Sequence, residues 1–140
     1  MQPLAGSENY FEHDADIGII GRGENLEVCF ADAAKAVFSL MVNLSSVRPR
    51  EIVTFEFEEA DVELALVIWL NLLIAKAAEH HMVFCDFRLH RKGALWKAIV
   101  SGEKWQANMD RGIEVKGATL TMLSVKNDHH RWEARCVVDV

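Results

Sequence analysis

The chain has 140 residues, of which 51% are hydrophobic and 26% charged, a composition that fits one globular domain and excludes a largely disordered chain. Its 15 basic and 21 acidic residues give a net charge of −6, which argues against a broad nucleic-acid-binding surface. The opening residues lack the basic-then-apolar order of a signal peptide, and no apolar run reaches the roughly 18 residues that span a bilayer. We therefore expect a soluble cytoplasmic protein that contacts neither a membrane nor DNA.

The first predicted element is an amphipathic helix over residues 26–41. Apolar residues recur from Leu26 to Met41 with the spacing of one helical face, while Glu27 and Lys35 fall on the other face. Asn25 is a suitable N-cap, because its side-chain oxygen can accept a hydrogen bond from a first-turn amide. The pattern therefore predicts the helix and also where it begins.

A strand and a second helix follow in the chain. Apolar and polar residues alternate over 53–58, which is typical of a strand with one buried face. Asp61 is then a predicted cap for a helix over 62–81, whose residues from 64 to 75 are apolar except Asn71. This apolar run is too short for a membrane span, so it indicates a central core helix. Asn71 then requires a hydrogen-bond partner.

The remaining sequence predicts strands. Alternation over 83–90 leads to a hairpin turn at Arg91-Lys92-Gly93 and a strand from Ala94 to Ser101, with Gly102 marking a bulge or turn. Asn127-Asp128 separates two further strands, the last of which ends at Val140. Half-solvated strands with short connections indicate an antiparallel arrangement. We expect an α+β fold with a single domain, a mainly antiparallel β-sheet and two helices packed on one face.

The cysteines predict reduced, buried thiols. Cys29, Cys85 and Cys136 are odd in number, lie among apolar neighbours and form no CxxC pair. The histidine pairs His80-His81 and His129-His130 have no cysteine at zinc spacing, so the pattern does not favour a zinc site.

The end of the last predicted strand concentrates negative charge. Asp139 falls on its solvent face, next to the α-carboxylate of Val140, and both groups ionise well below neutral pH. Asp16 would add a third carboxylate if its strand pairs with the last one. Such hard oxygen ligands suit Ca²⁺, Mg²⁺ or Mn²⁺. From the pattern alone, a solvated chain end is favoured over a metal site. The pattern likewise favours Lys116 as an ordinary solvated strand residue.

A combination of short segments, in order along residues 9–140, resembles the archease family. They are FEHDADIGI at 11–19, LE at 26–27, FADAA at 30–34, FSLM at 38–41, WLNLL at 69–73, GE at 102–103, VKGAT at 115–119 and VDV at 138–140. The resemblance implies an archease-like domain over 9–140 that follows a flexible N-terminal segment over 1–8.

What the resemblance implies is an accessory protein rather than an enzyme. Archeases assist the GTP-dependent RNA ligase that joins 2′,3′-cyclic phosphate or 3′-phosphate ends to 5′-hydroxyl ends in tRNA splicing and RNA repair. They promote guanylylation of the ligase's active-site histidine and allow multiple turnover. RNA would then be met only indirectly, through the ligase.

The resemblance also assigns roles to particular residues. The aspartate of the family's HxADIG segment falls on Asp16, its lysine on Lys116 and its penultimate aspartate on Asp139, and these are the expected partner-activating residues. The same two aspartates and the terminal residue, here Val140, are implied to hold a divalent cation, calcium first, with magnesium and manganese as alternatives. Two side-chain carboxylates and one chain end supply fewer oxygens than calcium prefers, so waters or a partner would complete the shell.

The chain departs from the family pattern at two places. Leu120-Thr121 replaces the usual Tyr-His, and an expected histidine is replaced near Met109-Asp110. Both departures put the affinity for the ligase in doubt. Two other functions stay open: a metal-dependent phosphoester hydrolase, for which no base or nucleophile stands out, and a chaperone-like or RNA-binding module, for which Trp96-Lys97 and Lys104-Trp105 offer a modest signal.

Overall fold

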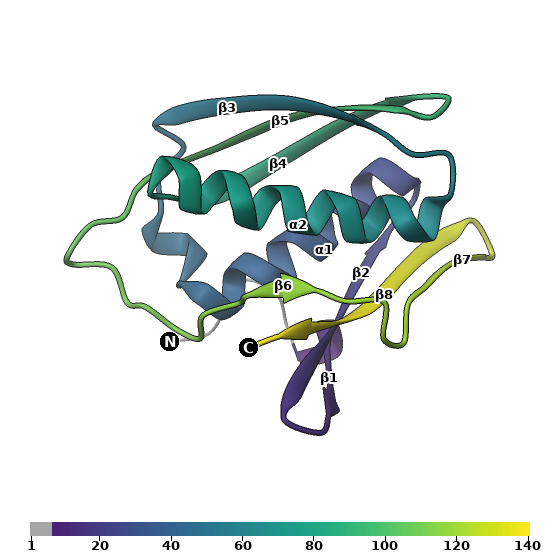
Figure 1. The fold of residues 1–140 in the computed structure, drawn as a ribbon, viewed down its shortest axis with the longest axis horizontal. Coiled ribbons are helices and arrows are strands. Elements are labelled where there is room, and N and C mark those ends of the chain that lie inside the picture. Colours follow the sequence, from purple (N-terminus) through teal and green to yellow (C-terminus); the bar gives the residue numbers. More distant parts are fainter. Residues whose placement is uncertain (1–6) are drawn as a thin grey trace.

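The computed structural model describes residues 7–140, and Figure 1 shows their fold. Most of the expected flexible segment over 1–8 lies outside the described residues. The elements in chain order are η1 (Ser7–Asn9), β1 (Tyr10–His13), β2 (Asp16–Gly23), α1 (Leu26–Met41), η2 (Leu44–Ser46), β3 (Glu51–Glu58), α2 (Val62–His80), β4 (Met82–Lys92), β5 (Leu95–Lys104), β6 (Gly117–Ala118), β7 (Ser124–Asp128) and β8 (Arg131–Asp139).

The strands form two antiparallel sheets with both helices between them (Figure 1). One sheet has the order β3-β5-β4, and the other has the order β1-β2-β8-β6, with β7 also paired to β8. Each helix packs against strands of both sheets. The predicted α+β fold with antiparallel strands and two helices is confirmed. The division into two sheets is an additional finding, because alternation reports which face of a strand is buried and not which sheet it joins.

Helix α1 begins as its sequence predicts. The N–H of Val28 donates to the side chain of Asn25 at 2.8 Å, which satisfies one of the amides that a helix N-terminus leaves unpaired. The helix then packs closely on β2, because a Cβ built on Gly21 would lie only 2.5 Å from the main-chain nitrogen of Ala33. The absence of a side chain at Gly21 therefore allows α1 to pack closely against β2.

Helix α2 buries one face in the core, through Ala65, Leu66, Trp69, Leu70, Leu73 and Ala77, while Leu64, Asn71 and Ala75 are exposed. The prediction of a central core helix is therefore right for one face only, because an apolar run does not by itself show how many sides of a helix are covered. Asp61 caps it by accepting hydrogen bonds from the N–H groups of Glu63 and Leu64 at 2.9 and 3.1 Å. Trp69 is fully buried, and its indole N–H donates to the carbonyl of Phe30 in α1 at 2.9 Å. This bond satisfies the only polar atom of a large apolar side chain, so Trp69 joins the two helices at little polar cost.

The predicted hairpin between β4 and β5 is confirmed, with Gly93 in the left-handed region at φ 61°. Gly102 lies inside β5, and the bulge lies opposite it in β4, between Phe84 and Asp86. A Cβ at Gly102 would collide with the carbonyl oxygen of Val83. Within residues 7–140, no helix is long and apolar enough to cross a membrane.

All three cysteines are free thiols, as predicted. Burial raises the pKa of Cys29 and of Cys136 from 9.0 to about 12, and the carboxylate of Asp32 adds to the effect at Cys29. Burial also raises the pKa of the half-buried Cys85, to about 11. At neutral pH these thiols are therefore protonated, and nucleophilic chemistry at them is disfavoured.

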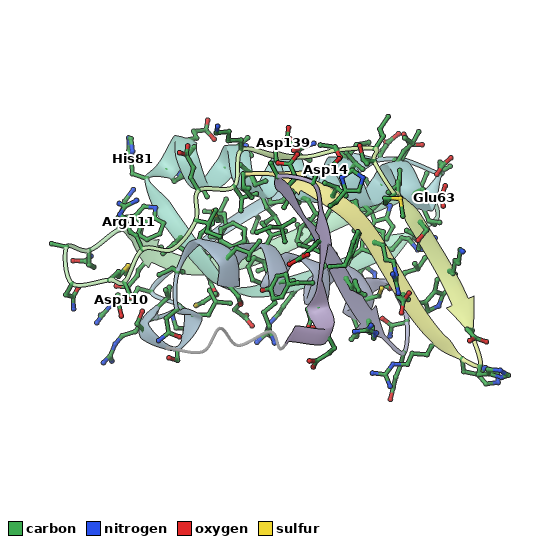
Figure 2. All side chains as sticks on the ribbon, turned by 90° about the horizontal axis from the view of Figure 1, so that it is seen from below. Asp14, Glu63, His81, Asp110, Arg111 and Asp139 are labelled. Atoms are coloured by element: carbon green, nitrogen blue, oxygen red, sulfur yellow. The ribbon has the colours of Figure 1, made fainter. Side chains whose placement is uncertain are left out.

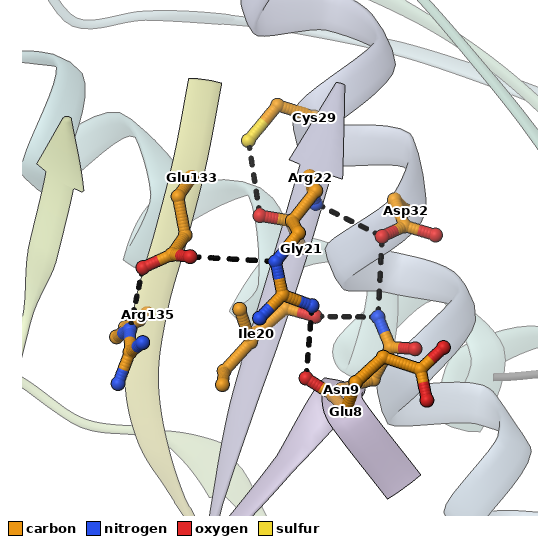
Figure 3. A network of polar contacts seen from close by, with 9 residues as sticks. All are labelled: Glu8, Asn9, Ile20, Gly21, Arg22, Cys29, Asp32, Glu133 and Arg135. Atoms are coloured by element: carbon orange, nitrogen blue, oxygen red, sulfur yellow. Dashed lines mark hydrogen bonds and ion pairs between the residues drawn. The ribbon is translucent and has the colours of Figure 1, made fainter. Parts of the chain in front are cut away.

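A polar network ties β2 to β8 and to α1 (Figure 3). Arg22 of β2 lies opposite Glu133 of β8, and its Nε is 3.3 Å from a Glu133 carboxylate oxygen. Glu133 also accepts from Arg135 at 2.7 Å, and this contact lowers the Glu133 pKa. On the helix side, Asp32 accepts from the Arg22 N–H at 2.9 Å and from the buried side chain of Asn9 at 3.2 Å. The Arg22–Glu133 pair therefore joins β2 to β8, and the Asp32 contacts join α1 to β2 and to Asn9.

Candidate functional site

The register of β2 and β8 brings the two predicted aspartates to one edge of the five-stranded sheet. Ile17 pairs with Val138, so Asp16 at the start of β2 and Asp139 at the end of β8 are the next residues along their strands. The N–H of Val140 donates to Oδ1 of Asp16 at 3.3 Å. This contact joins residues that are 124 positions apart. The third carboxylate therefore stands beside the strand end, as the sequence predicts.

Lys116 reaches the same edge from the other side of β8. Gly117 of β6 pairs with Asp139, and the N–H of Lys116 donates to the Asp139 carbonyl at 2.8 Å. The main chains of all four predicted site residues thus lie at one edge, with Asp16 in β2, Asp139 and Val140 at and after the end of β8, and Lys116 just before β6. Lys116 and Asp139 are exposed, whereas Asp16 and Val140 are half-buried. Figure 2 shows Asp139 at the same edge as Asp14, in the turn between β1 and β2.

Asn71 of α2 is a positioning residue for this edge. Its side-chain nitrogen donates to the carbonyl of Ala118 at 3.1 Å, and its Oδ1 accepts from the Ala118 N–H at 2.8 Å. A Cβ on Gly117 would lie 3.2 Å from the same Oδ1. The side-chain amide of Asn71 therefore bonds to the main chain of β6 through both its nitrogen and its oxygen. Asn71 is the single polar residue of the apolar run 64–75, which signals that it has a partner, although sequence alone does not say that the partner is β6.

The turn before Asp16 has its own polar contact. Asp14 adopts a left-handed conformation at φ 52°, which Asp tolerates better than most residues. His13 Nδ1 lies 3.9 Å from an Asp14 carboxylate oxygen, and the His13 main chain pairs with Asp16. The imidazole of His13 and the carboxylate of Asp14 therefore lie in the β1–β2 hairpin, just before Asp16.

The oxygen donors at this edge suit a hard cation better than zinc. No group of three or more His, Cys, Asp and Glu side chains gathers as a metal site in the part of the chain that the structure describes. The predicted set differs, because it consists of the Asp16 and Asp139 carboxylates and the main-chain carboxyl group of Val140. One Asp16 oxygen already accepts from Val140, so the set fits an open site that needs further ligands.

The sequence of the chain matches a known protein family. Residues 9–140 match the model of the Archease protein family (MTH1598/TM1083). The chain belongs to the archease family. The Protein archease of Pyrococcus abyssi is 34% identical over 137 residues, covering 94% of this chain and 96% of the relative. The Protein archease of Sulfurisphaera tokodaii is 32% identical over 134 residues with the same two coverages.

Solved structures of archeases have the same fold. The solution structure of protein 1598 from Methanobacterium thermoautotrophicum superposes with a TM-score of 0.80 at 26% identity, covering 94% of this chain and 97% of that one. The crystal structure of an archease and possible chaperone from Thermotoga maritima gives a TM-score of 0.66 at 20% identity, covering 93% and 94% of the two chains. The predicted archease-like fold is therefore confirmed.

Proposed function

We propose that this archease is an accessory protein, without catalytic activity of its own, that activates the GTP-dependent RNA ligase of tRNA splicing and RNA repair in the cytoplasm. The observation that supports this function best is the convergence of Asp16, Lys116, Asp139 and Val140. Contacts across β8 hold three separate parts of the chain there. Membership of the archease family supports the choice of partner.

The four residues have different tasks in this proposal. Asp16, Asp139 and the main-chain carboxyl group of Val140 would hold a divalent cation, calcium first, with magnesium and manganese as alternatives. When bound, the ion supplies positive charge that attracts phosphate or carboxylate oxygens of the docked ligase. Lys116 offers a second, mobile positive charge on a flexible side chain. Because the site is open and Asp139 is exposed, groups of the ligase can complete it.

The contact with RNA is proposed to be indirect. Trp96 is fully buried and stacks on Phe30 at 4.8 Å between ring centroids, so its face is not free to stack on a base. The ring of Trp105 is covered by Arg111, whose guanidinium carbon lies 3.9 Å from the ring centroid. The aromatic residues beside Lys97 and Lys104 are therefore engaged within the protein.

A ligation assay tests the proposed function. The ligase, GTP, a divalent metal and RNA with 3′-phosphate and 5′-hydroxyl ends are mixed with wild-type archease, Asp16→Ala, Lys116→Ala or Asp139→Ala. We expect each variant to lose multiple turnover, because each removes a group of the site. Asp128→Ala and Lys126→Ala, which lie on and beside the exposed β7–β8 turn, are matched controls that keep full stimulation. Full multiple turnover with all three folded site variants would overturn the proposal.

A further inference from the structure

A groove of about 680 Å³ runs between the C-terminal half of α2 and the extended segment 111–116. The segment is held in place by main-chain bonds from Gly112 to Met41 at 2.8 Å and from Ile113 to Leu40 at 2.7 Å. At the end of the segment, the main-chain N–H of Lys116 donates a hydrogen bond to the carbonyl of Asp139. The groove therefore has two firm walls, and its volume lies within the range of small-ligand sites.

The floor of the groove is apolar. Met82 is 2% exposed, Val115 3% and Ala77 7%, and all three line the groove. At the rim, the side chain of Ile113 is 45% exposed and borders the groove. An apolar group bound in the groove would cover it. Burial of that exposed apolar surface favours a ligand with an apolar body.

The rim of the groove is cationic in a protein whose net charge is −6. Arg111 and Lys116 supply its positive charge, against the single carboxylate of Glu114, and the imidazole of His81 also lines it. Figure 2 shows His81 and Arg111 near each other at one end of the molecule. Among residues 7–140, Arg111 and Lys116 form no ion pair. The positive charges at this rim are therefore available to an incoming anion.

Arg111 is also oriented in advance. Its guanidinium carbon lies 3.9 Å from the centroid of the Trp105 ring, so the planar group is held by the ring face. The edge of a stacked guanidinium keeps its N–H donors free to bind two oxygens of one anion at once. Little side-chain entropy is then lost when a carboxylate, sulfonate or phosphate binds there.

We propose that this groove binds a small amphiphilic anion, that is, a ring-sized apolar body carrying one carboxylate, sulfonate or phosphate group. The body lies on Met82, Val115 and Ile113, and the anionic group meets Arg111 with Lys116 as a second cation. This site shares Lys116 with the carboxylate edge at Asp16 and Asp139, whereas Arg111 and the apolar floor lie outside that edge. Binding at Arg111 does not depend on the proposed activation of a ligase.

The test uses 8-anilinonaphthalene-1-sulfonate, with N-phenyl-1-naphthylamine as the same body without its sulfonate. We expect the sulfonate probe to bind one site per chain and to bind more tightly than the neutral probe. Arg111→Gln weakens the sulfonate probe at least about fivefold, as loss of a charge-assisted contact implies, and leaves the neutral probe unchanged. Arg111→Lys restores part of the affinity. Arg88→Gln, in a second groove of about 660 Å³ beside Ile52 and Ile99, is the matched control and changes neither probe.

A second variant tests the apolar part of the groove. Ala78 is an exposed α2 residue that lines the groove, so Ala78→Phe fills the recess without disturbing the buried core. We expect it to weaken both probes, with circular dichroism and the urea midpoint unchanged. Equal affinity for the two probes in wild type, or sulfonate binding that survives both Arg111→Gln and Ala78→Phe, would overturn the proposal.

Discussion

The main-chain N–H of Val140 donates to the carboxylate of Asp16 at 3.3 Å. This bond ties the last residue to the first residue of β2, and it extends the pairing of β2 with β8 by one position. Val140 therefore lies beside Asp16 at the same edge of the sheet as Asp139.

Replacement of the aspartates is expected to weaken binding of a divalent cation. Asp16→Asn and Asp139→Asn each remove one negative charge from a set of three, so we predict at least an about tenfold loss of calcium affinity for each variant. Calorimetric titration with calcium measures it, and Asp128→Asn, on the exposed β7–β8 turn, serves as the control. Wild-type affinity in both site variants would show that the cation does not bind there.

Extension of the chain beyond Val140 is a separate test of the main-chain carboxyl group. A short Gly-Ser tail turns that carboxylate into a neutral amide while leaving Asp16 and Asp139 in place. We predict weaker calcium binding and an unchanged urea midpoint, because the tail is added after Val140 and replaces no side chain that packs against the core. Equal calcium affinity with and without the tail would contradict a role for the terminal carboxylate.

Loss of the Asn71 amide is expected to loosen β6. Asn71→Ala removes both hydrogen bonds to Ala118, which predicts a loss of about 1–2 kcal/mol in the free energy of unfolding and faster hydrogen exchange at Lys116 and Ala118. Asn71→Asp keeps the acceptor for the Ala118 N–H and is the matched control. If exchange at Lys116 and Ala118 were unchanged in Asn71→Ala, then α2 would not position this edge.

The buried thiols make stability fall at alkaline pH. Burial raises the pKa of Cys29 and Cys136 from 9.0 to about 12, so the folded state binds these protons more tightly than the unfolded state does. Their contribution is complete below about pH 9 and is lost progressively as the pH rises towards 12. We predict a shallower decline for Cys136→Ala than for wild type when urea unfolding is followed from about pH 8 to about pH 11. Parallel declines would contradict this.

Both helices and strands β3, β4, β5, β7 and β8 could be predicted from the sequence, whereas no pattern indicated β1 or β6, and the assembly of the elements could not be predicted. Asn25 and Asp61 are recognised as caps because a cap contacts amides only two or three residues away. The partner of Asn71 lies 47 residues further along the chain. The helix sequence therefore indicates that Asn71 needs a hydrogen-bond partner but not which residue supplies it. The groove at Arg111 gave no signal for the same reason, because its walls come from α2 and a distant irregular segment.

The candidate site itself was only partly open to prediction from residue patterns. Alternation in the last strand correctly places Asp139 in solvent, and it names Asp16 as a third carboxylate only on the condition that β2 pairs with β8. That pairing joins strands that are far apart in the chain, such as at Arg22 opposite Glu133, and no local pattern contains it. The resemblance to archeases supplied Lys116, whose residue type and spacing alone describe an ordinary solvated lysine.

Formation of the covalent ligase–GMP adduct is the most direct measurement of the proposed function. The ligase is incubated with labelled GTP and metal, alone or with wild-type archease, Asp16→Ala, Asp139→Ala or the control Asp128→Ala. We predict that wild type and the control accelerate adduct formation and that both site variants leave it near the rate of the ligase alone. Equal acceleration by all four proteins, or none by wild type in a complex shown to form, would contradict activation through the Asp16–Asp139 edge.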